Sequence, residues 1–147
     1  MSRIEELWAR EKIRDRLIVY CQAIDQRDWP LLRSCFGDDH QHDHGSFQGD
    51  ADAFIAFAKQ HLTRAEFCRH ILTNIHIVLE ADGLHAQTQS SFFSIQRFPG
   101  EGETPSTDWL VSGSYHDTLV CDQEDWLIVK RVGKNEWIRK ETVQPSS

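Results

Sequence analysis

Long hydrophobic runs are absent from this sequence of 147 residues. A membrane-spanning helix needs about 20 consecutive apolar residues, and the runs here extend over only a few, so we expect no membrane partner. The opening stretch MSRIEELWAREK is charged from its third residue, which is unlike a secretory signal. We therefore expect a cytoplasmic protein.

Basic charge is also scarce, with 16 Lys and Arg against 23 Asp and Glu and a formal net charge of -7. A chain of this sign repels phosphate backbones, so nucleic acid is not an expected partner. Cys21, Cys35, Cys68 and Cys121 form no CxxC motif, which argues against a zinc knuckle, a redox motif or covalent haem. Because no export signal is present, we expect four buried or half-buried thiols rather than disulfides.

No internal repeat, low-complexity tract or interdomain linker divides the chain. Its length fits one domain with a single core, and its 39% hydrophobic and 27% charged residues are typical of a globular protein. We expect a single domain over residues 1–140 and a flexible tail at residues 141–147.

The first half of the sequence has helical periodicity. Apolar residues recur between Ile4 and Gln26 with the 3.6-residue period, which predicts one long helix. Asp28 and Pro30 favour a short second helix directly afterwards. We then expect a strand at residues 39–44, a turn at residues 45–49, and a third helix over residues 51–61 that Asp50 caps.

The second half alternates with the period of strands. Strands are expected within residues 71–83, 85–98, 109–121 and 125–132, joined by turns and by a longer loop at residues 99–108. Helices followed by consecutive antiparallel strands indicate an α+β fold, in which helices pack against one face of a curved sheet. One face of the first of these strands is too apolar to stay in water, so we expect a homodimer or homotrimer. This face comprises Ile71, Thr73, Ile75, Ile77 and Leu79.

Two polar residues stand out from the pattern of their elements. Asp25 follows Leu17 and Cys21 at helical spacing, which places a carboxylate on an apolar face, where desolvation is costly without a partner. A helix-ending Asp25 that caps the next turn is the simple alternative. His70 opens a strand, where a hydrogen-bonded structural histidine is the common case. If the two side chains meet at about 2.6–3.2 Å, the carboxylate would fix one imidazole tautomer and produce a general base.

Three stretches carry a resemblance to a known family: AIDQRDWPLLRSCFGDD (residues 23–39), RHILTNIHIVLEADG (residues 69–83) and SGSYHDTLVCDQEDWLIVKR (residues 112–131). Their order and spacing resemble the SnoaL-like, scytalone dehydratase-like group of the nuclear transport factor 2-like superfamily. The resemblance implies a cone-shaped, mostly antiparallel curved sheet wrapped by N-terminal helices, as in a cystatin-like α+β barrel. It also implies a catalytic dyad of Asp25 and His70 that needs no cofactor, and a polar contact to substrate from Asn74.

The sequence departs from the family at several pocket positions. Members of the group carry a lysine near Tyr20, a second histidine near Gln89 and an asparagine near Tyr115, while Ile24 stands in place of a tyrosine. The resemblance therefore supports a general base in this chain but not the groups that act on a leaving group in those members of the family. We expect Tyr20, Gln89 and Tyr115 to contact substrate, although Tyr115 could equally lie with its hydroxyl at the pocket rim.

A cluster of histidines lies in the stretch HQHDHG. His40, His42 and His44 alternate, so on a strand they share one face. Such a triplet can bind zinc on a β-ribbon, or it can form a solvated strand or a subunit contact. We favour a polar pocket wall in which His42 and His44 contact substrate, without a metal.

Two functions are compatible with these features. The favoured one is a cofactor-independent lyase or isomerase, of dehydratase or cyclase type, that removes a proton from a small hydrophobic cyclic or aromatic carbonyl compound. The alternative is a non-catalytic ligand-binding or oligomerisation domain of the same fold. The small subunits of ring-hydroxylating dioxygenases share the fold but are typically longer.

Overall fold

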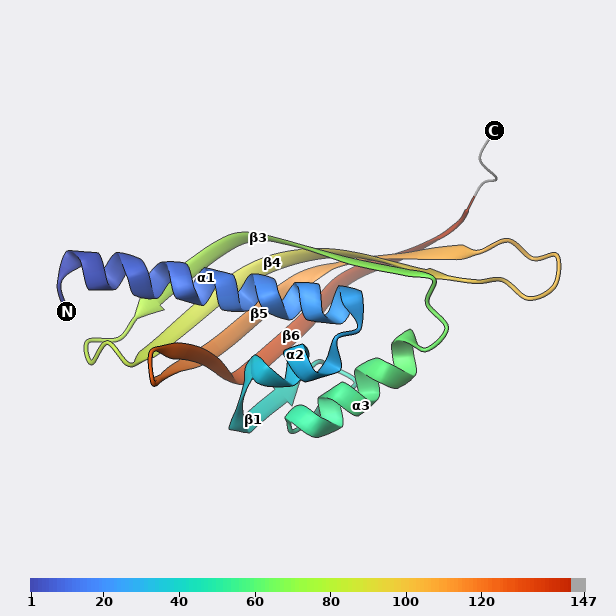
Figure 1. Cartoon of the computed structure of the whole chain (residues 1–147). Coiled ribbons are helices and arrows are strands. Elements are labelled where there is room, and N and C mark those ends of the chain that lie inside the picture. The colour runs from blue at the N-terminus through green and yellow to red at the C-terminus, as the bar shows by residue number, and fades with distance from the viewer. Residues whose placement is uncertain (144–147) are drawn as a thin grey trace.

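Three helices precede most of the strands and pack against a curved sheet in the computed structural model, which describes residues 1–143 (Figure 1). The helices are α1 (Arg3–Gln26), α2 (Trp29–Ser34) and α3 (Ala51–Leu62). The strands are β1 (Phe36–Asp43), β2 (Gln48–Gly49), β3 (Phe67–Leu79), β4 (His85–Phe98), β5 (Thr107–Asp122) and β6 (Asp125–Thr142). This is the α+β architecture that the sequence predicts.

The six strands form one sheet in the order β2-β1-β6-β5-β4-β3. β1 runs parallel to β6, and every other neighbouring pair is antiparallel. The sheet is not closed into a barrel, because β2 and β3 are its edge strands. Helix α1 lies across one face of the sheet and ends near the middle of the molecule (Figure 1). The last turn of α1 therefore lies beside the first residues of β3.

The long helix α1 is defined by its cap and its apolar face. The Ser2 hydroxyl accepts from the Glu5 backbone amide while the Glu5 carboxylate accepts from the Ser2 amide, the reciprocal pair that satisfies unpaired helix N–H groups. Ile13 and Leu17 are fully buried against the sheet. The same helical face continues through Cys21 to Asp25, which explains how a carboxylate reaches the interior.

Several strand boundaries differ from the sequence prediction; β1 begins at Phe36 rather than at residue 39, and β3 spans Phe67–Leu79 rather than residues 71–83. The expected turn at residues 45–49 contains β2, because a tight turn at Gly45 (φ 68°) lets Gln48 and Gly49 pair back with β1. β6 continues ten residues beyond the predicted end at residue 132 and pairs with β5 up to Thr142. Its second half is exposed, so no apolar alternation marked it as a strand. Residues 141 and 142 of the expected tail thus belong to β6, and residues 144–147 lie outside the described part.

A β-bulge in β3 overturns the expected apolar outer face. The register shifts between Thr73 and His76, and Asn74 takes a left-handed conformation with φ 52°. The extra residue reverses the alternation. Ile77 is therefore in the core, and Ile75 and Leu79 are packed against it. Of the predicted face, only Ile71 is a large apolar side chain that stays exposed.

The cysteines occupy the environments that the sequence predicts. Cys21, Cys35 and Cys68 are buried free thiols and Cys121 is half-buried and free. None of the helices described between residues 1 and 143 is long and apolar enough to cross a membrane.

Candidate active site

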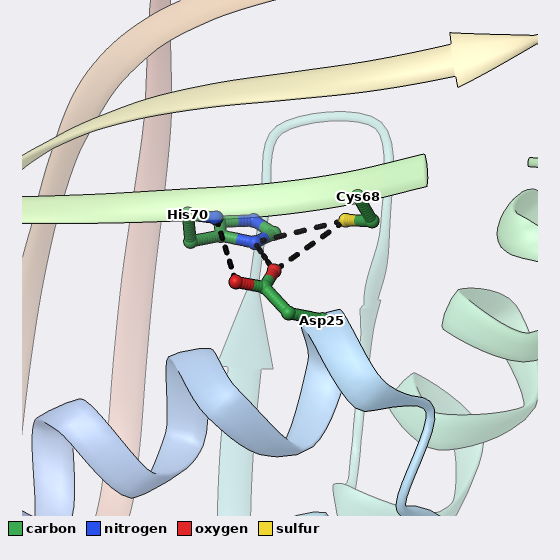
Figure 2. Close-up of side chains that lie close together, drawn as sticks. All are labelled: Asp25, Cys68 and His70. Carbon is green, nitrogen blue, oxygen red and sulfur yellow. Dashed lines mark hydrogen bonds and ion pairs between the residues drawn. The ribbon is translucent and has the colours of Figure 1, made fainter. Parts of the chain in front are cut away.

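Asp25 and His70 meet where the last turn of α1 passes the beginning of β3 (Figure 2). Asp25 Oδ1 lies 2.7 Å from His70 Nδ1, and Asp25 Oδ2 accepts a hydrogen bond of 2.9 Å from the backbone N–H of His70. The two side chains are only 13% and 8% exposed. The alternative role of Asp25 as a cap is wrong, since Asp28 caps α2 and Arg27 ends α1.

The hydrogen bonds fix the tautomer of the His70 ring. An ionised carboxylate can only accept, so Nδ1 carries the proton and donates it to Asp25. In the neutral ring Nε2 then holds a free lone pair, and it makes no hydrogen bond with any residue among 1–143. A carboxylate that orients an imidazole in this way also stabilises the imidazolium that forms when Nε2 takes up a proton.

Cys68 is the third side chain of this cluster. It lies two residues before His70 on β3 and so shares its face of the strand. Its Sγ is 3.6 Å from Asp25 Oδ1 and 3.9 Å from His70 Nδ1 (Figure 2). Burial, followed by the negative charge of Asp25, raises the pKa of the Cys68 thiol to about 12, so this cysteine is a protonated thiol at neutral pH and no nucleophile.

Two hollows flank the dyad. The outer groove, of about 540 Å³, lies between α1 and β3 and is lined by Cys21, Asp25, Cys68 and His70 together with charged residues such as Glu66. The inner cavity, of about 280 Å³, lies between the helices and the sheet and is lined by His70 but not by Asp25 or Cys68. Of these three residues, only His70 therefore lines both hollows.

The inner cavity has an aromatic wall and a few polar groups, the usual composition of a small-molecule site. Its aromatic wall comprises Tyr20, Phe54, Phe57, Phe92, Trp109 and Tyr115. Its polar groups come from His44, His61, Ser94, Gln96 and Asn135. Its volume is near the lower end of the ~300–1,000 Å³ typical of ligand pockets, which suits a compact ring.

Three of the predicted substrate contacts line this cavity with His70. Tyr20 and Tyr115 are both 1% exposed, with ring centroids 6.0 Å apart. Burial raises the pKa of Tyr20 to about 12 and that of Tyr115 well above its ordinary value, so both hydroxyls are protonated donors at neutral pH. His44 lies beside Gly133, where any Cβ would fall 2.5 Å from its Nδ1.

Three other predicted contacts do not line the inner cavity. Gln89 is exposed on the outer face, because the inward positions of β4 are the even-numbered ones such as Thr88 and Ser90. Asn74 is exposed at the bulge of β3. His42 is buried behind the cavity wall, with its ring stacked on Phe54 at 3.6 Å between centroids. None of these three residues therefore contributes to the lining of the inner cavity.

The histidine triplet is a chain of neutral imidazoles rather than a converging set of ligands. His40 Nδ1 lies 2.9 Å from the carbonyl oxygen of Ile128 and must donate to it, so His40 Nε2 accepts from His42 Nδ1 at 3.2 Å. Burial, as the largest cause, lowers the pKa of His40 to about 4 and of His42 to about 2, and it also lowers the pKa of His44. Among the described residues, the groups of His, Cys, Asp and Glu that converge as metal ligands are Asp25–Cys68–His70 and Glu80–Asp82–His85.

A buried ion pair behind the cavity was missed by the sequence reasoning. Arg131 is fully buried and donates two hydrogen bonds, of 2.7 and 2.6 Å, to the carboxylate of Asp117. Its guanidinium carbon lies 3.9 Å from the ring centre of Tyr20 and 4.1 Å from that of Tyr115, so it supports both rings. A signal existed, because Asp117 follows Tyr115 by two positions on one strand and therefore shares its inward face.

Comparison with known proteins adds a family match. A family model described as the SnoaL-like domain matches residues 5–132. No curated protein matches this chain.

Solved structures share the fold at low sequence identity. A candidate scytalone dehydratase from Novosphingobium aromaticivorans has a TM-score of 0.84 and 20% identity, covering 97% of this chain and 94% of its own. The hexachlorocyclohexane dehydrochlorinase LinA-type3 from Novosphingobium barchaimii has a TM-score of 0.83 and 15% identity over 99% and 100% of the chains. A candidate dehydratase of the NTF2-like family from Streptomyces avermitilis has a TM-score of 0.69 and 12% identity over 86% and 96%.

Proposed function

This chain belongs to the family of SnoaL-like domains, and on that premise we propose that it is a cofactor-independent lyase or isomerase that removes a proton from a small hydrophobic cyclic or aromatic carbonyl compound. The observation that carries the proposal is the 2.7 Å contact between Asp25 and a histidine that also lines an aromatic cavity. The names of the structural relatives, a dehydratase and a dehydrochlorinase among them, are in line with lyase chemistry.

The proposed step begins with His70 Nε2 taking a proton from the carbon next to the carbonyl group. The C–H electron pair becomes the carbon–carbon double bond of an enolate, and the carbonyl π electrons move onto oxygen. Asp25 stabilises the imidazolium, and a phenol O–H of Tyr20 or Tyr115 donates to the developing oxyanion. In an elimination, the oxyanion electrons re-form the carbonyl group, the double bond shifts to the α and β carbons, and the β-substituent leaves with its bonding electrons and takes the proton from His70. In an isomerisation, His70 returns the proton to another carbon.

The proposal can be tested before the natural substrate is known. A base that reaches a carbon acid exchanges its proton with solvent, so we expect the wild-type protein to incorporate deuterium from D2O into some members of a panel of small cyclic ketones, measured by NMR. His70→Gln should lower the exchange rate by about 10²–10⁴-fold, the usual contribution of general acid–base catalysis.

A matched control is provided by the chain itself. Asp82 and His85 form a second Asp–His contact, of 2.6 Å, that is exposed and away from the inner cavity. His85→Gln should exchange at the wild-type rate. Equal rates for wild type and His70→Gln would remove His70 as the base and leave the ligand-binding alternative.

The remaining expectations about partners and location are also proposals. We infer a homodimer or homotrimer, supported by a row of side chains in register across the outer face of four strands. This outer row comprises Ile71, Phe93, Ser112 and Trp137; Ile71 and Trp137 are 47% and 46% exposed. A cytoplasmic location is likewise proposed.

A further inference from the structure

We propose that Asp25, Cys68 and His70 form a binding site for a thiophilic divalent cation such as Zn²⁺, entered from the outer groove, and that the bound cation switches off the dyad. The three ligand atoms are Asp25 Oδ1, Cys68 Sγ and His70 Nδ1, and they lie within 4.8 Å of one another. Carboxylate, thiolate and imidazole are the donors that zinc prefers in proteins.

The spacing of the three atoms suits a tetrahedral cation. With Zn–S of ~2.3 Å and Zn–N and Zn–O of ~2.0–2.2 Å, tetrahedral ligands lie ~3.4–3.6 Å apart. The Sγ–Oδ1 and Sγ–Nδ1 distances are 3.6 and 3.9 Å. Only the Nδ1–Oδ1 pair, at 2.7 Å, has to widen, because a cation replaces the proton between these two atoms.

The surroundings leave room for a fourth ligand. All three residues line the outer groove of about 540 Å³, so a water molecule can complete the coordination from that side. Asp25 Oδ2 stays bonded to the His70 amide at 2.9 Å, which holds the carboxylate in place while Oδ1 ligates. Such a carboxylate-to-backbone bond is the type of support that orients ligands in metal sites.

Cation binding changes where the protons of Cys68 and His70 lie, and this change would inhibit the proposed reaction. Binding releases the thiol proton of Cys68 to solvent, because thiolate is the ligand form. The proton on His70 Nδ1 must also leave that atom, and the neutral ring takes one up at Nε2. The cation thus moves the His70 proton from Nδ1 to Nε2 and removes the Nε2 lone pair that the proposed reaction uses. Binding stands independently of the proposed function, whereas inhibition rests on it.

Co²⁺ provides the probe, because thiolate ligation gives it a charge-transfer absorption that oxygen and nitrogen ligands alone do not. The full chain, kept reduced with a phosphine, should develop this absorption with one Co²⁺ per chain, and Zn²⁺ should abolish it. Cys68→Ser should lose the absorption while keeping the circular dichroism spectrum of the wild type. Cys121→Ser, which removes a more accessible thiol, and His85→Gln, which removes a ligand of the exposed Glu80–Asp82–His85 group, should keep it.

Each outcome decides for or against the site. Absence of the absorption in the wild type, or its survival in Cys68→Ser, overturns the proposal. Should Cys68→Ser fail to fold, ¹⁵N spectra of the wild-type His70 ring decide instead, because Zn²⁺ must move its proton from Nδ1 to Nε2. If the absorption appears but His70→Gln exchanges deuterium like the wild type, the proposed function fails and the cation site stands. If the absorption is absent but His70→Gln abolishes exchange, the cation site fails and the proposed function stands.

Discussion

The Asp25 carboxylate accepts two hydrogen bonds from one residue. Oδ2 binds the backbone amide of His70 and Oδ1 binds its ring, so the position of the carboxylate and the tautomer of the imidazole are fixed together. Two bonds from adjacent groups also leave the carboxylate little freedom to turn toward the solvent of the outer groove. The imidazole that we propose as the base is therefore held in one orientation without a substrate.

Asp25→Asn tests this orientation. An asparagine amide would donate to Nδ1 rather than accept from it, which favours the tautomer with its proton on Nε2. We expect deuterium exchange to fall by about 10²–10⁴-fold with little change in fold. Asp15→Asn, at an exposed position of the same helix, is the control, and an Asp25→Asn rate equal to that of Asp15→Asn would contradict the assigned role.

The neutral histidines predict an acid sensitivity. The unfolded chain protonates imidazoles below about pH 6.5, whereas burial holds the folded-state pKa of His42 at about 2 and of His40 at about 4. Their contribution to stability is therefore fully present above about pH 6.5 and is lost as the pH falls below it. As the pH falls from about 7 to about 5, His40 and His42 should each lower the free energy of unfolding by roughly 2 kcal/mol.

Urea unfolding at these two pH values measures the effect. His42→Phe keeps a ring against Phe54 but cannot titrate. Between the two pH values this variant should therefore lose roughly 2 kcal/mol less unfolding free energy than the wild type loses. His116→Gln, at an exposed position, should lose as much as the wild type. Equal losses in all three proteins would show that His42 is not buried in the neutral form.

At the scale of single residues, the sequence pointed to Asp25 more clearly than to the residues around it. Asp25 stood out because a carboxylate interrupted an apolar helical face, and Tyr20 lies on the buried side of the same helix. Arg131 did not stand out, because a basic residue directly after Lys130 looks solvated unless its cross-strand neighbour is known. Its partner Asp117 is set by register between β5 and β6, which a single sequence does not reveal.

At the scale of elements, the bulge in β3 decides which side chains reach the interior. His70 and Leu72 precede it, and Ile75 and Ile77 follow it with the opposite phase. A strand without the bulge would turn either the dyad histidine or Ile77 away from the core. Strict alternation was the assumption behind the expected apolar outer face of β3, which the bulge overturns.

Substitutions at Asn74 test the strand's special conformation. Asn74 has φ 52°, which glycine adopts freely and β-branched residues resist. We expect Asn74→Gly to keep the wild-type unfolding free energy within about 0.5 kcal/mol and Asn74→Val to lose about 1–3 kcal/mol. Thr73→Val, at the exposed neighbouring position, should stay near the wild type. An Asn74→Val variant with the unfolding free energy of the wild type would mean that the bulge is absent.

Element boundaries were predictable where burial shapes the pattern. Helix α1 and strand β4 agree with the expected ranges to within a residue or two, because each has one buried face. The second half of β6 and the two-residue β2 were not found. Both are held by backbone pairing while most of their side chains are exposed, so their sequences carry no apolar alternation to detect.

At the scale of the whole molecule, the outer row of Ile71, Phe93, Ser112 and Trp137 crosses β3 to β6 without a covering element in residues 1–143. Side chains this apolar on neighbouring strands favour contact with another copy of the chain. We expect light scattering at micromolar concentration to give two or three times the mass of the chain. Trp137→Lys should give the monomer, and Trp8→Lys, at a 63% exposed position of α1, should not. A monomeric wild type would contradict the inference.

The α+β architecture follows from order and periodicity, but the hollow inside it does not. Which inward side chains meet across the interior depends on sheet curvature and on where α1 ends relative to β3. The contact of Asp25 with His70 joins positions 45 residues apart in sequence, and only the family resemblance suggested it.

The tautomer of the His70 ring tests the central claim most directly. ¹⁵N-labelled protein, with the ring signals assigned by comparison with His70→Gln, shows by NMR which nitrogen of the neutral ring carries the proton. A proton on Nδ1 and a bare Nε2, changed by Asp25→Asn but not by Asp15→Asn, is the result we expect. A proton on Nε2 in the wild type would leave no lone pair there to take a proton from a substrate and would contradict the proposed role of His70.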